Sequence, residues 1–141
     1  MRRNAWMAAS GAMYGYRRMA KKILIVDDEK EIRAELAGYL LDKGYEVEEA
    51  ADGLEALDKF EASPADVVIT DMKMPRCPGD ELTRRLRAVD PDLLVIILTG
   101  HYTNADMESA KKAGATTVLK KPARLSELRR LLERLTEAPE G

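Results

Sequence analysis

The chain has 141 residues, of which 45% are hydrophobic and 34% charged, and its formal net charge is −2 at pH 7. These values are typical of one soluble globular domain that can bury a core without a disulfide or structural metal. A single cysteine, Cys77, excludes a disulfide framework and favours a reducing, cytoplasmic setting.

Charge is distributed unevenly along the chain. Residues 1–20 contain four arginines and no acid, so the remaining 121 residues carry a net charge of −6. An acidic body argues against direct nucleic-acid binding, which needs a basic face. No apolar run approaches the length of about 20 residues that spans a bilayer, so we predict no membrane span. For residues 1–20, a non-essential or mis-called start, a docking helix and a targeting segment all stay open.

From residue 21 to residue 136, short aliphatic runs alternate with amphipathic segments, and residues 137–141 form a short tail. Runs at 23–26, 67–70, 93–98 and 117–119 predict buried strands, and the alternating run at 45–50 predicts an edge strand. Amphipathic patterns between and after these runs predict five helices, the fourth of which has few large apolar residues. Gly44 and Gly114 are predicted helix stops. Strands that are apolar on both faces indicate an α/β fold with a parallel sheet covered on two sides.

Polar residues follow four of the predicted strands. They are Asp27-Asp28, Thr70-Asp71, Thr99-Gly100 and Lys120-Lys121. In open parallel sheets, ligands bind at the carboxyl ends of the strands, so these side chains are predicted to converge there. Three carboxylates about 5 Å apart repel by roughly 3 kcal/mol per pair at an effective dielectric near 20. A hard dication with oxygen ligands, such as Mg²⁺, relieves that repulsion.

Each residue of this group also has a structural interpretation. Asp28, with Glu31 three residues later, could form a capping box at the start of the first helix. Asp71 could be a turn residue, Thr99 a loop hydroxyl and Lys121 a solvated loop lysine. Their joint occurrence at the strand ends of one sheet favours a site.

Four motifs, ILIVDDE, VVITDMKMP, VIILTG and VLKKP, occur in this order. Together they resemble the receiver domain of two-component response regulators over about residues 21–136. The resemblance implies a flavodoxin-like, doubly wound fold with five parallel strands in the order 2-1-3-4-5 and five helices.

The resemblance also implies roles for individual residues. Asp71 would accept a phosphoryl group from a histidine kinase or phosphotransfer protein. Mg²⁺, or Mn²⁺, would be bound by Asp28, Asp71 and the Lys73 carbonyl, with Asp27 acting through water. Thr99 and Lys121 would contact the phosphoryl group. Lys121 matches the family lysine better than Lys120, which stays an alternative.

Some positions depart from the family pattern or flank the site. Val118 lies three residues before the lysine, where the family often has an aromatic ring, so a switch based on ring movement is in doubt. Lys73, Gly100 and His101 are candidate modulators of phosphoryl lifetime. For His101 we favour an exposed loop imidazole over a base or a phosphohistidine relay. For Cys77 we favour an incidental thiol over a redox sensor.

The leading hypothesis is a single-domain response regulator that signals by phosphorylation-dependent contact with a downstream protein. The alternative is a receiver domain from a longer DNA-binding regulator or hybrid histidine kinase. We do not predict an enzyme acting on other substrates, because a haloacid-type phosphatase would use Asp27 and Glu29 and leave Asp71 without a role. The last helix carries four arginines, for which a solvated face is the default interpretation; they are Arg124, Arg129, Arg130 and Arg134. The resemblance also implies that the face of the last two helices can engage partners, and arginines there suit an acidic partner or a homodimer.

Overall fold

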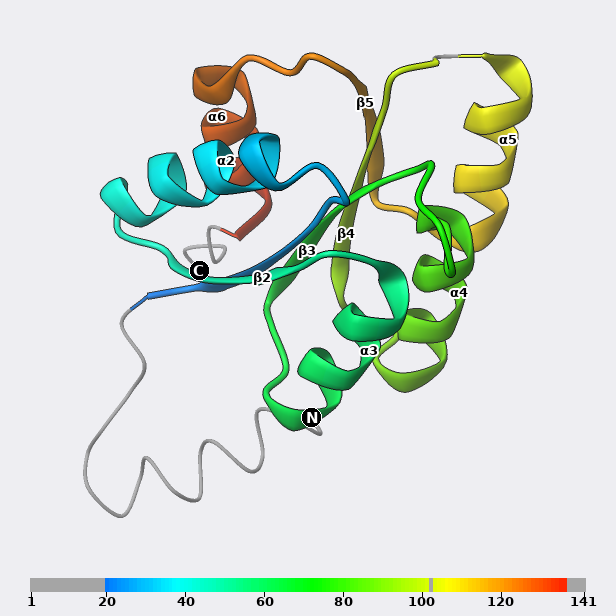
Figure 1. Cartoon of the computed structure of the whole chain (residues 1–141), viewed down its shortest axis with the longest axis horizontal. Helices are drawn as coiled ribbons and strands as arrows, with labels where there is room; N and C mark the ends of the chain where they lie inside the picture. The colour runs from blue at the N-terminus through cyan, green and yellow to red at the C-terminus, as the bar shows by residue number, and fades with distance from the viewer. Residues whose placement is uncertain (1–19, 102, 137–141) are drawn as a thin grey trace.

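The structure, a computed structural model, describes residues 20–101 and 103–136, so the C-terminal tail and all but the last residue of the predicted N-terminal extension lie outside these residues (Figure 1). Within these ranges, five strands form one parallel sheet in the order β2-β1-β3-β4-β5. The strands are β1 (Lys22–Val26), β2 (Glu46–Ala50), β3 (Val67–Asp71), β4 (Leu94–Thr99) and β5 (Thr117–Lys120). The helices are α2 (Lys30–Asp42), α3 (Gly53–Ala62), α4 (Gly79–Val89), α5 (Asn104–Ala113) and α6 (Leu125–Thr136). This architecture confirms the predicted fold and places β2 at the edge of the sheet.

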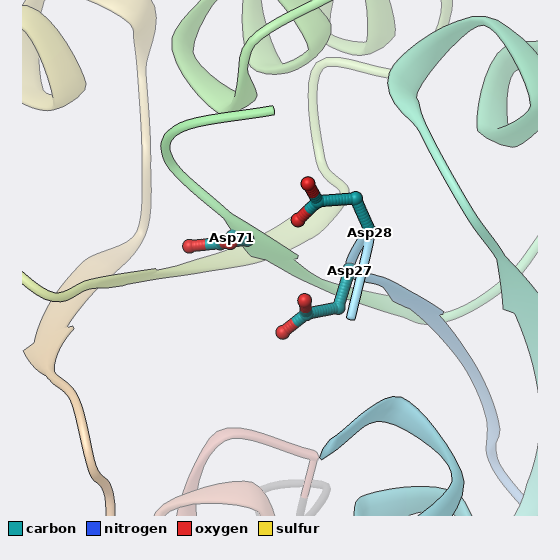
Figure 2. A group of neighbouring side chains, drawn as sticks. All are labelled: Asp27, Asp28 and Asp71. Carbon is teal, nitrogen blue, oxygen red and sulfur yellow. The ribbon is translucent and has the colours of Figure 1, made fainter. Parts of the chain in front are cut away.

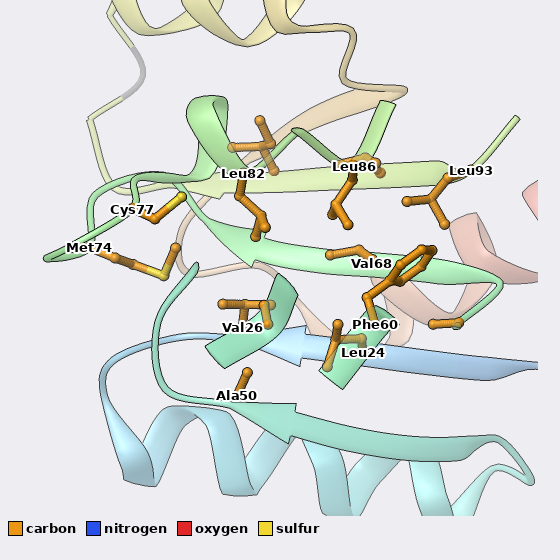
Figure 3. Close-up of a cluster of buried hydrophobic side chains, with 14 of the residues drawn as sticks. Leu24, Val26, Ala50, Phe60, Val68, Met74, Cys77, Leu82, Leu86 and Leu93 are labelled. Carbon is orange, nitrogen blue, oxygen red and sulfur yellow. The ribbon is translucent and has the colours of Figure 1, made fainter. Parts of the chain in front are cut away.

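The sheet separates two hydrophobic layers. Leu24 and Val26 of β1 point into the layer built with α3, α4 and α5, which contains Phe60 and Leu82 (Figure 3). Ile23 and Ile25 of β1 belong to the opposite layer, built with α2 and α6. Each central strand is therefore apolar on both faces, as expected where helices cover a parallel sheet on two sides.

The helix ends are mostly as predicted from the glycines. Gly114 ends α5 with φ of 98°, and Gly44 follows α2 with φ of 97°, a conformation that residues with a Cβ adopt with strain. The structure does not form the capping box that was the structural alternative for Asp28. The N-cap residue is Glu29, and no side chain among the described residues caps this helix. The helix begins one residue later than the capping box requires, which leaves the Asp28 carboxylate free to join its two acidic neighbours described below.

Strand β4 ends one residue later than predicted and includes Thr99. The parallel pairing with β5 explains this, because Thr99 is in register with Lys120. Among the described helices, none is long and apolar enough to cross a membrane.

The Arg87 side chain joins three segments near the amino ends of β4 and β5. Its guanidinium donates hydrogen bonds to the carbonyls of Gly114 at 2.9 Å, Pro91 at 3.2 Å and Leu93, and to the Thr116 hydroxyl at 3.2 Å. One side chain thus satisfies several backbone acceptors that the adjoining strands do not reach.

Arg87→Met is expected to lower the free energy of unfolding by about 1–3 kcal/mol, because it leaves partly buried carbonyls without a donor. Urea denaturation monitored by circular dichroism measures the change. Arg84→Met is the matched control, since Arg84 lies exposed on the same helix and pairs with Glu81 at 3.0 Å. Exposed pairs contribute little, so the control should change stability by less than about 0.5 kcal/mol. Equal losses in the two variants would contradict the role assigned to Arg87.

Candidate functional site: a carboxylate cluster at the carboxyl end of the sheet

Three aspartates converge at the carboxyl ends of two neighbouring strands. Asp27 directly follows β1, Asp71 is the last residue of β3, and these strands pair in parallel. Carboxylate oxygens of Asp27, Asp28 and Asp71 lie within 4.8 Å of one another (Figure 2). Asp27 and Asp71 are 4% and 8% exposed, whereas Asp28 is exposed to solvent. The sheet topology thus brings together the acids that the sequence predicted would meet.

Each buried carboxylate is held by two different donors. The Glu29 amide donates to Asp27 Oδ1 at 2.9 Å, and the Met72 amide donates to Asp71 Oδ1 at 2.9 Å. The second oxygens face Lys121, whose Nζ lies 3.3 Å from Asp27 Oδ2 and 3.4 Å from Asp71 Oδ2. These contacts fix the direction of both carboxylates.

Lys121 is the cation of the site, and Lys120 is not. Lys121 has an 18% exposed side chain and also lies 3.8 Å from Glu29 Oε1. Lys120 is exposed at the end of β5. One lysine therefore faces several carboxylates, and the site keeps an excess of negative charge.

That excess is reflected in the pKa values of the paired groups. Burial raises the pKa of Asp71, Lys121 lowers it, and the Asp27 charge raises it again, so the net pKa is above that of an ordinary aspartate. Burial alone would lower the pKa of Lys121, but Asp71 and Asp27 together raise it above the ordinary value. Carboxylate oxygens with uncompensated charge are the donor set that a hard divalent cation prefers.

The predicted switch residue Thr99 ends β4 and is completely buried. Its hydroxyl donates to the His101 carbonyl at 3.0 Å and accepts from the His101 amide at 3.2 Å. Gly100 and His101 are exposed, in agreement with the interpretation of His101 as a loop residue. Val118 is partly buried and packs against the layer that contains α5. In this arrangement the Thr99 hydroxyl is bonded to its own loop.

The loop between β3 and α4 places the remaining predicted residues. Lys73 has an exposed side chain, with Nζ 3.5 Å from Asp106 Oδ1. Cys77 is 1% exposed, and burial raises the pKa of its thiol, which does not suit a redox sensor. A side chain at Gly79 would collide with the Asp71 carbonyl, so the loop can close over the end of β3 only with glycine there.

Sequence reasoning missed two arginine side chains that join separate elements near the site. Arg33 of α2 donates to the Asp27 carbonyl at 2.7 Å and to Glu49 Oε1 of β2 at 3.0 Å. Arg76 pairs at 3.4 Å with Asp52, the residue that caps α3. Neither pair has a sequence signal, because each joins residues that are far apart in the chain.

The four arginines predicted for the last helix comprise Arg124, which directly precedes α6, and three residues within it. Arg129 pairs with Glu133 on the same helix at 3.1 Å. Arg124, Arg130 and Arg134 are exposed. The homodimer through this face stays a prediction.

The sequence and the fold are similar to those of known proteins. The family model for the response regulator receiver domain matches residues 23–133. Response regulator MprA of Mycobacterium sp. (strain KMS) is 40% identical over 126 residues, which cover 87% of this chain and 55% of that protein. The chain therefore spans about half the length of the curated relatives it matches.

Two solved structures show the same arrangement of strands and helices. Chemotaxis protein CheY4 of Vibrio cholerae matches with a TM-score of 0.78 and 36% identity, over 82% of this chain and 98% of that chain. The receiver domain of sensor histidine kinase PA1611 from Pseudomonas aeruginosa PAO1, which has a magnesium ion in its active site cleft, matches with a TM-score of 0.77 and 30% identity. That match covers 84% of this chain and 99% of the other.

The raised pKa of Asp71 leads to a prediction for the metal-free protein. Because the folded state opposes ionisation of Asp71, stability falls as pH rises from the unfolded pKa, about 3.9, through the higher folded pKa. Asp71→Asn is therefore expected to raise the thermal midpoint at pH 7, and the gain should vanish as pH falls toward 4. Differential scanning calorimetry in a chelating buffer measures it.

Asp58→Asn is the matched control, because Asp58 is exposed on α3 and its loss should leave the midpoint unchanged. A lower midpoint for Asp71→Asn at pH 7 would show that contact with Lys121 outweighs the cost of burial.

Proposed function

The chain belongs to the response regulator receiver domain family, and from that membership we propose that it is a phosphorylation switch whose acceptor is Asp71. The phosphoryl donor would be a phosphohistidine on a histidine kinase or a phosphotransfer protein. The observation that carries the proposal is the Asp71 carboxylate, held at the carboxyl end of β3 between Lys121 and two other acids.

The chain's own residues can perform the transfer. An Asp71 oxygen would attack phosphorus, forming a P–O bond as the P–N bond to the donor imidazole breaks and its electron pair leaves with the ring. The Met72 amide already bonds Asp71 Oδ1 and limits the directions from which the carboxylate can attack. Lys121 would exchange part of its contact with the carboxylates for phosphoryl oxygens, which carry more charge. Lys121 thus serves as the fixed positive charge of the site.

The donor set fits a divalent cation. Three carboxylates with oxygens within 4.8 Å of one another match the oxygen ligands that Mg²⁺ prefers. Asp28, Asp71 and the Lys73 carbonyl would hold the ion, with Asp27 through water, and Mn²⁺ could use the same donors. When bound, Mg²⁺ supplies positive charge that offsets the charge of the phosphoryl oxygens.

Thr99 would report the modification. Its hydroxyl bonds the His101 carbonyl in the unmodified protein, and a phosphoryl group on Asp71 offers a more strongly charged acceptor. Turning toward that group would release the backbone of residues 100 and 101 at the start of the loop to α5. The signal would then reach a downstream protein through changed contacts on the domain surface.

Two forms of the whole protein are consistent with this proposal. CheY4, of which this chain covers 98%, supports the candidate of a single-domain regulator, which would act in the cytoplasm by contact with a downstream protein. MprA, of which the matched region forms 55%, supports a second candidate, a receiver unit within a longer regulator. In both, the domain would catalyse its own phosphorylation and dephosphorylation and not the turnover of other substrates.

Incubation with acetyl phosphate and Mg²⁺ tests the acceptor. Intact-protein mass spectrometry is expected to show one added phosphoryl group on the wild type and none on Asp71→Asn. Chelation of Mg²⁺ should abolish the adduct. Asp58→Asn controls for loss of an aspartate elsewhere and should be modified like the wild type. An adduct of the same size on Asp71→Asn would rule out Asp71 as the acceptor.

The metal assignment is tested separately by isothermal titration with Mg²⁺. Asp28→Asn is expected to weaken binding at least tenfold, because it removes one direct carboxylate ligand. The Asp58→Asn variant should bind Mg²⁺ like the wild type. Unchanged affinity in Asp28→Asn would mean that Asp28 is not a ligand.

A further inference from the structure

Lys73 connects the acceptor loop to helix α5. It lies two residues after Asp71, and its Nζ is 3.5 Å from Asp106 Oδ1. The Lys73 side chain is 65% exposed and the Asp106 side chain 14% exposed. An exposed cation two residues after Asp71 is therefore paired with a largely buried anion of helix α5.

The position of Asp106 is well defined by its own helix. Asp106 lies in the first turn of α5, where the helix dipole favours a negative charge. Its backbone amide donates to the hydroxyl of Thr103, the N-cap residue, at 3.1 Å. The carboxylate is thus a fixed acceptor toward which the flexible Lys73 side chain reaches.

The fully buried side chains of helix α5 are small. Its buried residues are Ala110 and Ala113, both small, so little apolar area holds the helix against the sheet. Elements with few buried apolar contacts respond most readily to a change in local polar contacts. The ion pair between Lys73 and Asp106 therefore contributes a larger share of the anchoring of α5 than a surface pair would on α4, which buries Leu82 and Leu86.

We propose that Asp106 is a positioning residue for Lys73, holding its ammonium at α5 until a phosphoryl group on Asp71 competes for it. The inference rests on the proposed phosphorylation of Asp71. A phosphoryl group carries more negative charge than a carboxylate, and the long, exposed lysine stem lets the ammonium change partners. Lys121 differs, since it contacts Asp27 and Asp71 already in the unmodified protein.

Competition makes the coupling reciprocal. If the phosphoryl group draws Lys73 from Asp106, then Asp106 must weaken the binding of the phosphoryl group to the same extent. Loss of the pair would free the first turn of α5, which borders a groove lined by Met107, Lys111 and Val118. Phosphorylation would thus reach the α5–β5 surface without the aromatic ring that Val118 replaces.

Beryllofluoride binding in the presence of Mg²⁺ tests the coupling at equilibrium, since this anion mimics the phosphoryl group. Asp106→Asn is expected to bind it about two- to fivefold more tightly than the wild type, the factor that corresponds to one exposed ion pair. Chemical-shift titration gives the affinity. Glu108→Gln is the matched control, because Glu108 is exposed on the same helix and forms no ion pair with the residues that the structure describes. Its affinity should equal that of the wild type.

A double-mutant cycle separates positioning from general electrostatics. Lys73→Gln should weaken beryllofluoride binding, and adding Asp106→Asn to Lys73→Gln should then change nothing. A through-space effect of the Asp106 charge would persist in the Lys73→Gln background.

A second readout needs neither metal nor phosphoryl mimic. In the unmodified protein, Lys73→Gln is expected to speed hydrogen exchange of the amides in the first turn of α5, whereas Glu108→Gln should not. Lys73→Gln without this effect, or Asp106→Asn with the affinity of Glu108→Gln, would overturn the inference while leaving the proposed function intact. A wild type that takes neither a phosphoryl group nor beryllofluoride would overturn both.

Discussion

The contact of Lys121 with Asp27 and Asp71 is the interaction on which the site depends. Parallel pairing of β1 and β3 forces two nearly buried carboxylates to the same edge of the sheet, where their repulsion is least screened. Lys121 arrives from the end of β5, at the far side of the sheet, and offsets part of that charge. The offset is partial, because the pKa of Asp71 is still raised by burial. A site with excess negative charge favours a bound cation. Only with that charge offset would the site accommodate a phosphoryl group, which is itself negatively charged.

The covered parallel sheet was predictable because its signals are local, whereas the strand order followed from the family resemblance. Strands that are apolar on both faces, and glycines at the ends of α2 and α5, indicate a covered parallel sheet without knowledge of any contact. The carboxylate cluster was predictable for a related reason. Asp27 and Asp71 stand at strand ends, and a parallel sheet brings the carboxyl ends of its strands to one edge. Hydrophobic periodicity and sheet topology together therefore predict which aspartates meet at the site.

The side chains that surround these aspartates were not predictable, because their contacts join residues of different elements. Arg33 reaches both the Asp27 carbonyl and Glu49, and Lys73 pairs with Asp106, without any pattern in the chain that links these residues. The capping box failed for a similar reason. Asp28 and Glu31 have the correct spacing, but the helix begins after Glu29, and the Asp28 carboxylate lies with Asp27 and Asp71 instead. Local propensity was overridden by the tertiary arrangement of charges.

Charge also decides how a change at Asp71 can travel. The loop after β3 carries two cations, and each is paired with an acid at the start of a different helix, Arg76 with Asp52 of α3 and Lys73 with Asp106 of α5. Helix α3 is anchored by Phe60, a large buried side chain, whereas α5 buries small alanines. Under the coupling proposed above, a phosphoryl group on Asp71 would compete for Lys73, and α5, which buries only small side chains, would respond more readily than α3. In that proposal the ion pair is the point of coupling, and the packing of each helix sets how far it responds.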